Sequence, residues 1–140
     1  MLFRSIGSSI DYYQYAKHTF YLMLNAQFNG LSHRGLVMSA AVAAYKNKAW
    51  ARQVQHEYKP LVSEADIETI CRLGALLQLA VALDRSESQP FERLDIAVKG
   101  GKLLLAPLGA RGPLEMERKE VEAIAADFKK IWELTPALTD

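Results

Sequence analysis

The sequence has little of what marks disulfide-rich, zinc-binding and membrane proteins. Its single cysteine, Cys71, excludes a disulfide framework and a zinc site built from several cysteines. No uninterrupted apolar run approaches the ~20 residues of a membrane-spanning helix. The opening residues 1–4 lack the long apolar stretch of a secretory signal. We therefore expect a cytoplasmic protein.

The chain also lacks a strong net charge, because 17 Lys and Arg residues face 16 Asp and Glu, giving +1. No global positive field can hold nucleic acid or a membrane, so a polyanion site must be local. Acidic residues are rare in the first part of the chain. Residues 1–56 contain one acid, Asp11, and six bases: Arg4, Lys17, Arg34, Lys46, Lys48 and Arg52. This excess favours either a local phosphate site or a solvated basic face balanced by the acidic C-terminal helix.

Common catalytic signatures are missing as well. The three histidines, His18, His33 and His56, do not have the one-turn spacing of a zinc pair. Cys71 lies on the apolar face of a strong helical pattern, where a thiol is normally inert. Neither glycine pair, at 100–101 or at 109 and 112, is followed by the Lys-Ser/Thr of a phosphate-binding loop. The residues alone yield no catalytic set.

What the sequence does have is the composition of one globular domain, with 50% apolar and 24% charged residues. Residues 1–86 read as helical. Helices are expected over about 9–25, from 33 to about 48, and over 64–83, and 50–60 is expected to be a polar connection. Ser63 and Asp66 resemble a capping box for the third helix. Gly74, in the middle of that helix, suggests close approach of a neighbouring helix.

The periodicity changes after residue 90. Apolar residues alternate with Asp95, Ala97 and Lys99, which predicts a half-buried strand, and Gly100–Gly101 predicts a hairpin turn before a return strand over 102–106. A third strand over 114–117 and a final helix ending before Pro136 are expected next. The predicted class is α+β, mainly α: about three long helices in 1–86, and a β-hairpin-plus-helix extension in 92–140 packed on them as one structural unit.

Six segments occur in an order and spacing similar to those of a known family: Ser9–Tyr13, Lys17–Leu22, Leu24–Asn25, Asn29–His33, Met38–Ala41 and Leu83–Ser86. Together they resemble the C-terminal HD-like region of the exopolyphosphatase / guanosine pentaphosphate phosphohydrolase (Ppx/GppA) family over about residues 2–106. The tail is similar to the family's terminal strand–helix extension. The resemblance implies an HD-like helical bundle. Family members carry a Mg²⁺-dependent catalytic core of the sugar-kinase/actin type ahead of this region. Nothing in the chain resembles that core, so we expect a detached C-terminal module with no cofactor of its own.

The chain departs from the family pattern where an HD metal centre would need its ligands. Phe3–Gly7 stands where many members read Leu-His-Asp-Ile-Gly, and Tyr15 and Ala16 stand where paired histidines are expected. Lys46 replaces a histidine and Val81 an aspartate. Positive charge at such positions opposes a divalent cation. The resemblance therefore implies a pocket suited to phosphoryl groups, edged by Arg4, His18, His33, Lys46 and Arg85.

From this resemblance we expect a non-catalytic domain that binds polyphosphate or (p)ppGpp and holds dimers together or docks on a Ppx/GppA-type catalytic domain. Neither nucleic acid nor a membrane is an expected partner. The residues expected to contact phosphate are Arg4, Lys17, His18, His33, Lys46 and Arg85. One alternative is a divergent metal-dependent HD phosphohydrolase that uses His18, His33 and Asp84. The other is a pure protein–protein scaffold.

Overall fold

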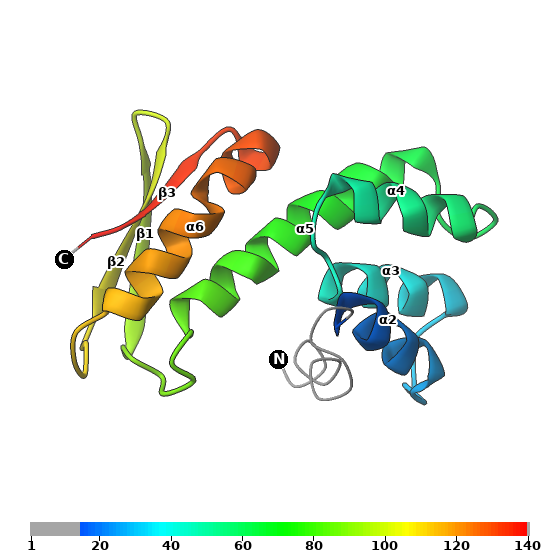
Figure 1. The fold of residues 1–140 in the computed structure, drawn as a ribbon, viewed down its shortest axis with the longest axis horizontal. Coiled ribbons are helices and arrows are strands. Elements are labelled where there is room, and N and C mark those ends of the chain that lie inside the picture. The colour runs from blue at the N-terminus through cyan, green and yellow to red at the C-terminus, as the bar shows by residue number, and fades with distance from the viewer. Residues whose placement is uncertain (1–14, 140) are drawn as a thin grey trace. The chain divides into compact units, whose positions relative to one another are not determined.

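The computed structural model describes residues 15–139 (Figure 1). The chain forms two compact units, Met1–Gly74 and Ala75–Asp140, and their boundary lies within the longest helix, α5 (Glu64–Leu83). The described residues form five helices and one three-stranded sheet, so the expected α+β, mainly α class is confirmed. No helix in the described range is long and apolar enough to cross a bilayer.

The first unit begins, in its described part, with two helices that pack on each other, α2 (Tyr15–Asn25) and α3 (His33–Ala43). They run in opposite directions (Figure 1). The hydroxyl of Ser32 accepts a hydrogen bond from the backbone N–H of Gly35 at 3.0 Å. This N-cap fixes the start of α3, because it satisfies a first-turn donor that has no partner within the helix.

The segment expected to be a polar connection is a helix, α4 (Lys48–Glu57), so that prediction was wrong. The second helix ends at Ala43 rather than near residue 48. The side chain of Asn47 accepts a hydrogen bond from the N–H of Trp50 at 3.0 Å and so caps the start of α4. Buried Ala51 and Val54 hold this mostly polar helix on the core.

An aromatic cluster packs α2 against α4. The ring of Phe20 meets those of Trp50 and Tyr58 edge to face, with centroids 5.4 and 5.7 Å apart. The indole N–H of Trp50 donates to the backbone oxygen of Ala41 at 3.1 Å, which also ties α4 to α3. The other buried apolar residues in the described part of this unit are Met23, Val37, Ala40, Ala41, Ala44, Tyr45, Ala51, Val54, Val62, Ile70 and Cys71.

The predicted start and end of α5 are confirmed. The backbone N–H and the hydroxyl of Ser63 both donate to the Asp66 carboxylate, at 2.7 and 2.9 Å. The predicted close approach at Gly74 is also found, but the neighbour is the Tyr45 side chain, just beyond the C-cap of α3.

The second unit contains the predicted hairpin, β1 (Arg93–Lys99) and β2 (Lys102–Leu108), joined by Gly100–Gly101. The expected third strand over 114–117 was wrong, because those residues lead into and begin α6 (Glu115–Trp132). Glu115 and Glu117 favour that helix start, since acids stabilise the positive end of a helix. The helix ends before Pro136, as predicted.

A strand that the sequence did not indicate, β3 (Thr135–Leu138), follows α6 and pairs with β2 in parallel. The sheet order is therefore β1-β2-β3, and α6 lies against one face of it (Figure 1). Pro136 is tolerated because β3 is an edge strand. The core between α6, the sheet and the end of α5 contains Ala75, Leu79, Ala82, Leu83, Leu105, Val121, Phe128 and Leu138.

Candidate anion-binding surface

The first unit concentrates positive charge on its helices. Between Tyr15 and His56 the sequence has five Lys and Arg residues and no Asp or Glu. One of the five, Arg34, is neutralised locally: its guanidinium binds both carboxylate oxygens of Asp66 at 2.8 Å. It also donates to the backbone oxygen of Leu61. Arg34 therefore ties α3 to the start of α5 and is not available for a ligand.

The Arg34–Asp66 pair has a clear electrostatic signature. The hydrogen bonds from Arg34, followed by the backbone N–H of Ser63, hold the pKa of Asp66 well below its usual range. The same carboxylate raises the pKa of Arg34. Asp66 is the partly buried member, with 13% of its side chain exposed against 50% for Arg34. This contact is a structural cross-link between elements that are distant in sequence.

The residues expected to contact phosphate divide into groups. Lys17 is exposed and His18 half-buried in the first turn of α2, and exposed Lys46 follows α3. Because α2 and α3 are antiparallel, these three belong to one end of the helix pair (Figure 1). His33 begins α3 at the other end, and a helix of 11 residues is about 16 Å long. Arg4 lies outside the described residues.

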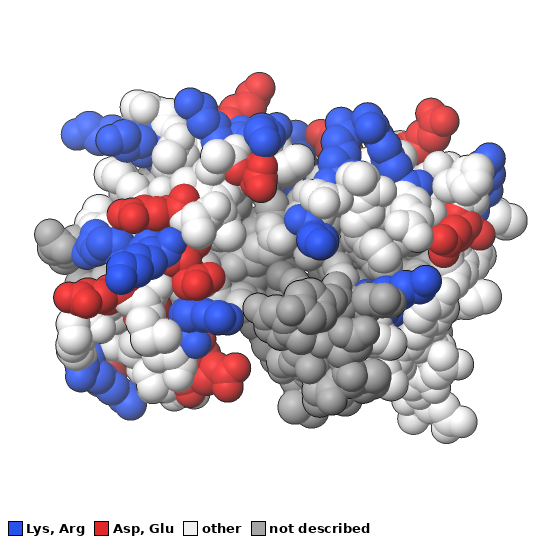
Figure 2. Space-filling view, viewed as in Figure 1, with Lys and Arg blue, Asp and Glu red and all other residues white. Residues whose placement is uncertain are grey.

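A further set of basic side chains lies along α4. Lys48, Arg52 and His56 are exposed and spaced four residues apart, so they share one face of the helix, which we call the α4 basic face. Figure 2 shows Lys and Arg side chains over the part of the surface that α4 forms. No acid occupies the first turn of α4, so Lys48 adds to the positive potential of the helix N-terminus.

The α4 basic face was missed as a unit because residues 50–60 were expected to form a connection. Two signals could have shown it. Asn47 is a favoured N-cap residue and so indicates the start of a helix. The three basic residues are spaced i, i+4 and i+8, which places them on one face if the segment is helical.

The two candidates from the Leu83–Ser86 segment lie in the second unit and have local partners. Arg85 contacts the carboxylate of Glu120 at 3.6 Å. A side-chain oxygen of Asp84 accepts the backbone N–H of Gln89 at 3.1 Å. Asp84 therefore closes the turn that ends α5. In the part of the chain that the structure describes, no three His, Cys, Asp or Glu residues are grouped to hold a metal. His18 and His33 belong to the first unit and Asp84 to the second.

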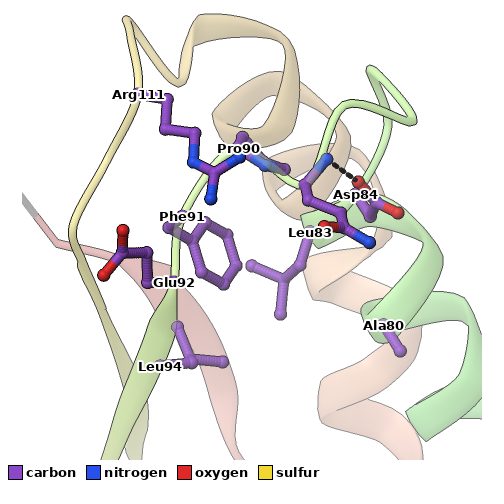
Figure 3. Close-up of a pocket in the computed structure, with 9 residues that line it drawn as sticks. Ala80, Leu83, Asp84, Pro90, Phe91, Glu92, Leu94 and Arg111 are labelled. Carbon is purple, nitrogen blue, oxygen red and sulfur yellow. Dashed lines mark hydrogen bonds between the residues drawn. The ribbon is translucent and has the colours of Figure 1, made fainter.

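One cavity of about 540 Å³ in the second unit lies beside this turn (Figure 3). The Phe91 ring and Leu83 face each other across it, and the Arg111 side chain reaches over Pro90 (Figure 3). Two carboxylates and one guanidinium line it, so its formal charge is negative and opposes phosphoryl groups. The full lining is Ala80, Leu83, Asp84, Gln89, Pro90, Phe91, Glu92, Leu94 and Arg111.

Comparison with known proteins decides the family. The family described as Ppx/GppA phosphatase, domain III, matches residues 2–104. The chain belongs to the Ppx/GppA phosphatase family. Its match to domain III covers the described helices of the first unit, all of α5 and β1, and β2 as far as Leu104. No curated protein matches the chain significantly.

Membership in the Ppx/GppA family identifies the chain as a domain of an exopolyphosphatase-type protein. The expected resemblance, over about 2–106, is thereby confirmed. Helix α6 and strand β3 lie beyond the matched residues. The α4 basic face and the candidate phosphate contacts of the first unit all lie within them.

Proposed function

We propose that this domain III binds a chain of phosphate groups, polyphosphate or a guanosine polyphosphate, and that another domain hydrolyses its phosphoanhydride bonds. One observation carries the proposal: in the described part of the first unit, the residues before Glu57 include no acidic side chain. Besides Arg34, whose charge Asp66 neutralises, the Lys and Arg residues of this stretch are Lys17, Lys46, Lys48 and Arg52, all exposed.

An extended ligand suits this distribution better than a compact one. Lys17, His18 and Lys46 lie at one end of the α2–α3 pair and His33 at the other. A single phosphate cannot reach both ends, whereas a phosphate chain can follow the helix surface. The α4 basic face adds contacts along one helix. Arg4 and Arg85 also belong to the proposed phosphate-binding residues. Arg85 leaves the Glu120 carboxylate and binds phosphate in its place.

In this role the chain catalyses no reaction. The domain supplies charge and hydrogen-bond donors, and it self-associates or docks on a catalytic domain of the same family. Exposed cations on a solvated surface give attraction that salt screens, because the Debye length is about 10 Å at 0.1 M ionic strength. Binding should therefore weaken steeply as salt is added.

The test is a titration of the purified chain with medium-length polyphosphate at low and at moderate salt. The double variant Lys48→Glu/Arg52→Glu should bind about tenfold more weakly or worse, because it reverses the α4 basic face. The matched control, Lys119→Glu/Lys129→Glu, makes the same change in net charge at exposed positions of α6. It should bind as the wild type does.

Two results would overturn the proposal. One is undetectable binding by the wild type at both salt concentrations. The other is an equal loss of affinity in both double variants, which would show a response to net charge alone. A stoichiometric Mn, Fe or Mg ion in the purified protein, with hydrolytic activity lost on His18→Ala, would support the metal-dependent hydrolase instead.

A further inference from the structure

Strand β1 leaves one edge of the sheet unpaired among the described residues. It is hydrogen-bonded to β2 alone, in the order β1-β2-β3. The turn residues Gly100 and Gly101 have φ of 57° and 72°, as a two-residue type I′ hairpin requires. In such a hairpin the flanking residues, Lys99 and Lys102, form a hydrogen-bonded pair. The backbone groups of Leu94, Ile96 and Val98 therefore point away from β2, toward the open edge.

The same edge carries uncovered apolar side chains. Ile96 is 62% exposed and Val98 is 64% exposed. Their cross-strand partners are Leu105 and Leu103, so all four lie on the same face of the sheet. Leu105 is only 1% exposed, because the core covers β2. The apolar face of the sheet is therefore buried at β2 but exposed at β1. An exposed apolar edge strand is a template for pairing with another strand.

The opposite face of β1 carries charges of both signs, from Arg93, Asp95 and Lys99, all exposed. This pattern is complementary to itself. If two copies of β1 pair antiparallel about a two-fold axis at Ala97, Asp95 stands opposite Lys99 of the partner subunit, twice by symmetry. Ile96 then stands opposite Val98 of the partner subunit, also twice. Opposite charges and apolar residues placed in this way stabilise a strand pair.

Other registers of the β1–β1 pair bring like charges together or mismatch the two faces of the sheet. An axis at Ile96 places Arg93 opposite Lys99, and an axis at Asp95 places two carboxylates together. A shift by one residue sets apolar side chains on the charged face, because side chains alternate along a strand. The axis at Ala97 also makes Ile96 and Val98 the hydrogen-bonded pair, as the outward direction of their backbone groups requires.

We propose that β1 pairs with β1 of a second copy of this chain, antiparallel and centred on Ala97, so that two three-stranded sheets become one of six strands. The inference rests on the self-association in the proposed function and names its surface. It uses the second unit only, so it stands or falls separately from phosphate binding by the α4 basic face. An isologous contact of this kind closes at a dimer.

The charge pairs allow a test by exchange, with the oligomeric state measured by sedimentation velocity over the micromolar range. Asp95→Lys and Lys99→Asp should each weaken the dimer about tenfold, or about 1.4 kcal/mol, because each places like charges opposite each other twice. The double variant Asp95→Lys/Lys99→Asp restores opposite charges and should recover most of the affinity. The control pair, Glu122→Lys and Lys119→Asp, changes exposed residues of α6 and should leave the dimer unchanged.

Ile96→Lys provides a second disruption that does not depend on the charge pairs, and its exposed position should keep the unit folded. A wild-type chain that stays monomeric, or a dimer indifferent to both single substitutions, would overturn the inference. A double variant that dimerises no more tightly than either single variant would also overturn it. The Ile96→Lys protein should still bind polyphosphate, so a loss of dimer and a loss of anion binding can be told apart.

Discussion

The side chain of Tyr45 occupies the space that a Cβ atom on Gly74 would need. An added Cβ would overlap the Cγ, Cβ and Cδ1 atoms of this tyrosine. Tyr45 is 4% exposed and lies just after the C-cap of α3. A glycine in the middle of α5 thus lets the end of α3 approach the helix closely.

Gly74→Ala should therefore destabilise the first unit. Alanine is the better helix former by about 1 kcal/mol. Forcing an extra methyl into a well-packed site typically costs about 1–3 kcal/mol, and here the atoms in the way are the base of a buried ring rather than a flexible end. The measurement is the free energy of unfolding by chemical denaturation. In a Tyr45→Gly background, which removes the Cβ of residue 45 as well as its ring, the same substitution should become neutral or stabilising. A more stable Gly74→Ala protein with Tyr45 in place would contradict the reasoning.

Local sequence signals sufficed for the elements whose stability is local. The start of α5 was predictable because Ser63 and Asp66 are close in sequence and form the cap themselves. The β1–β2 hairpin was predictable because strict alternation flanks a Gly-Gly turn. In contrast, β3 is four residues long, contains Pro136 and pairs with β2 across the whole of α6. No local pattern marks such a strand.

The candidate site shows the same division. A list of basic residues can be read from the sequence, but their partners cannot. Arg34 looks as available as Arg52 until the fold brings Asp66 to it across 32 positions. Helix α4 is polar over most of its length, so its apolar signal is weak, and in the structure the Asn47 cap and the contacts of Trp50 hold it in place.

The Arg34–Asp66 contact should make the first unit sensitive to acid. The folded pKa of Asp66 is depressed, so its contribution is complete above the ordinary carboxyl pKa near 4 and falls as the pH decreases below it. Asp66→Asn should lower the melting temperature at neutral pH and flatten its dependence on pH in the acid range. Thermal melts monitored by circular dichroism from neutral to acid pH would show this. Glu64→Gln, at an exposed neighbouring position, is the control. An unchanged acid slope in Asp66→Asn would be evidence against the role of this pair.

Glu117 should make the second unit sensitive to acid, as Asp66 does the first. It is 2% exposed, and one of its carboxylate oxygens accepts the backbone N–H of Ser86 at 3.1 Å. Burial raises its pKa, but hydrogen bonds from Ser86 and from the backbone N–H of Glu117 outweigh burial, so the pKa lies below its ordinary value. This stabilisation is present above the unfolded pKa and is lost as the pH falls through the folded one.

Glu117→Ala should therefore cost about 1–3 kcal/mol at neutral pH, because it leaves the Ser86 N–H without its acceptor. Chemical denaturation at neutral and at acid pH measures the effect, which should shrink as the wild-type carboxylate becomes protonated. Glu115→Ala, exposed in the same helix turn, should change the stability by less. Equal losses in the two variants would contradict a specific role for the bond to Ser86.

Asn47 offers a way to separate the fold of α4 from its charge. Asn47→Ala removes the side-chain acceptor for the backbone N–H of Trp50 and should destabilise the first unit by about 1 kcal/mol. It should also weaken polyphosphate binding modestly, because the first turn that carries Lys48 frays. Asn47→Asp keeps the cap and favours the helix dipole, so the helix should remain stable. The added carboxylate stands beside Lys46 and Lys48, however, and opposes a phosphate chain.

Asn47→Asp and a third variant, Asn47→Ser, should therefore rank in opposite order in stability and in polyphosphate affinity. Asn47→Asp should unfold at the higher denaturant concentration yet bind polyphosphate more weakly than Asn47→Ser, which caps the helix without a charge. A binding affinity that simply follows stability across Ala, Ser and Asp would show that only the fold of α4 matters. If instead the affinity falls most for the aspartate variant, and added salt weakens its binding less than that of the serine variant, the loss is due to the negative charge at the start of α4.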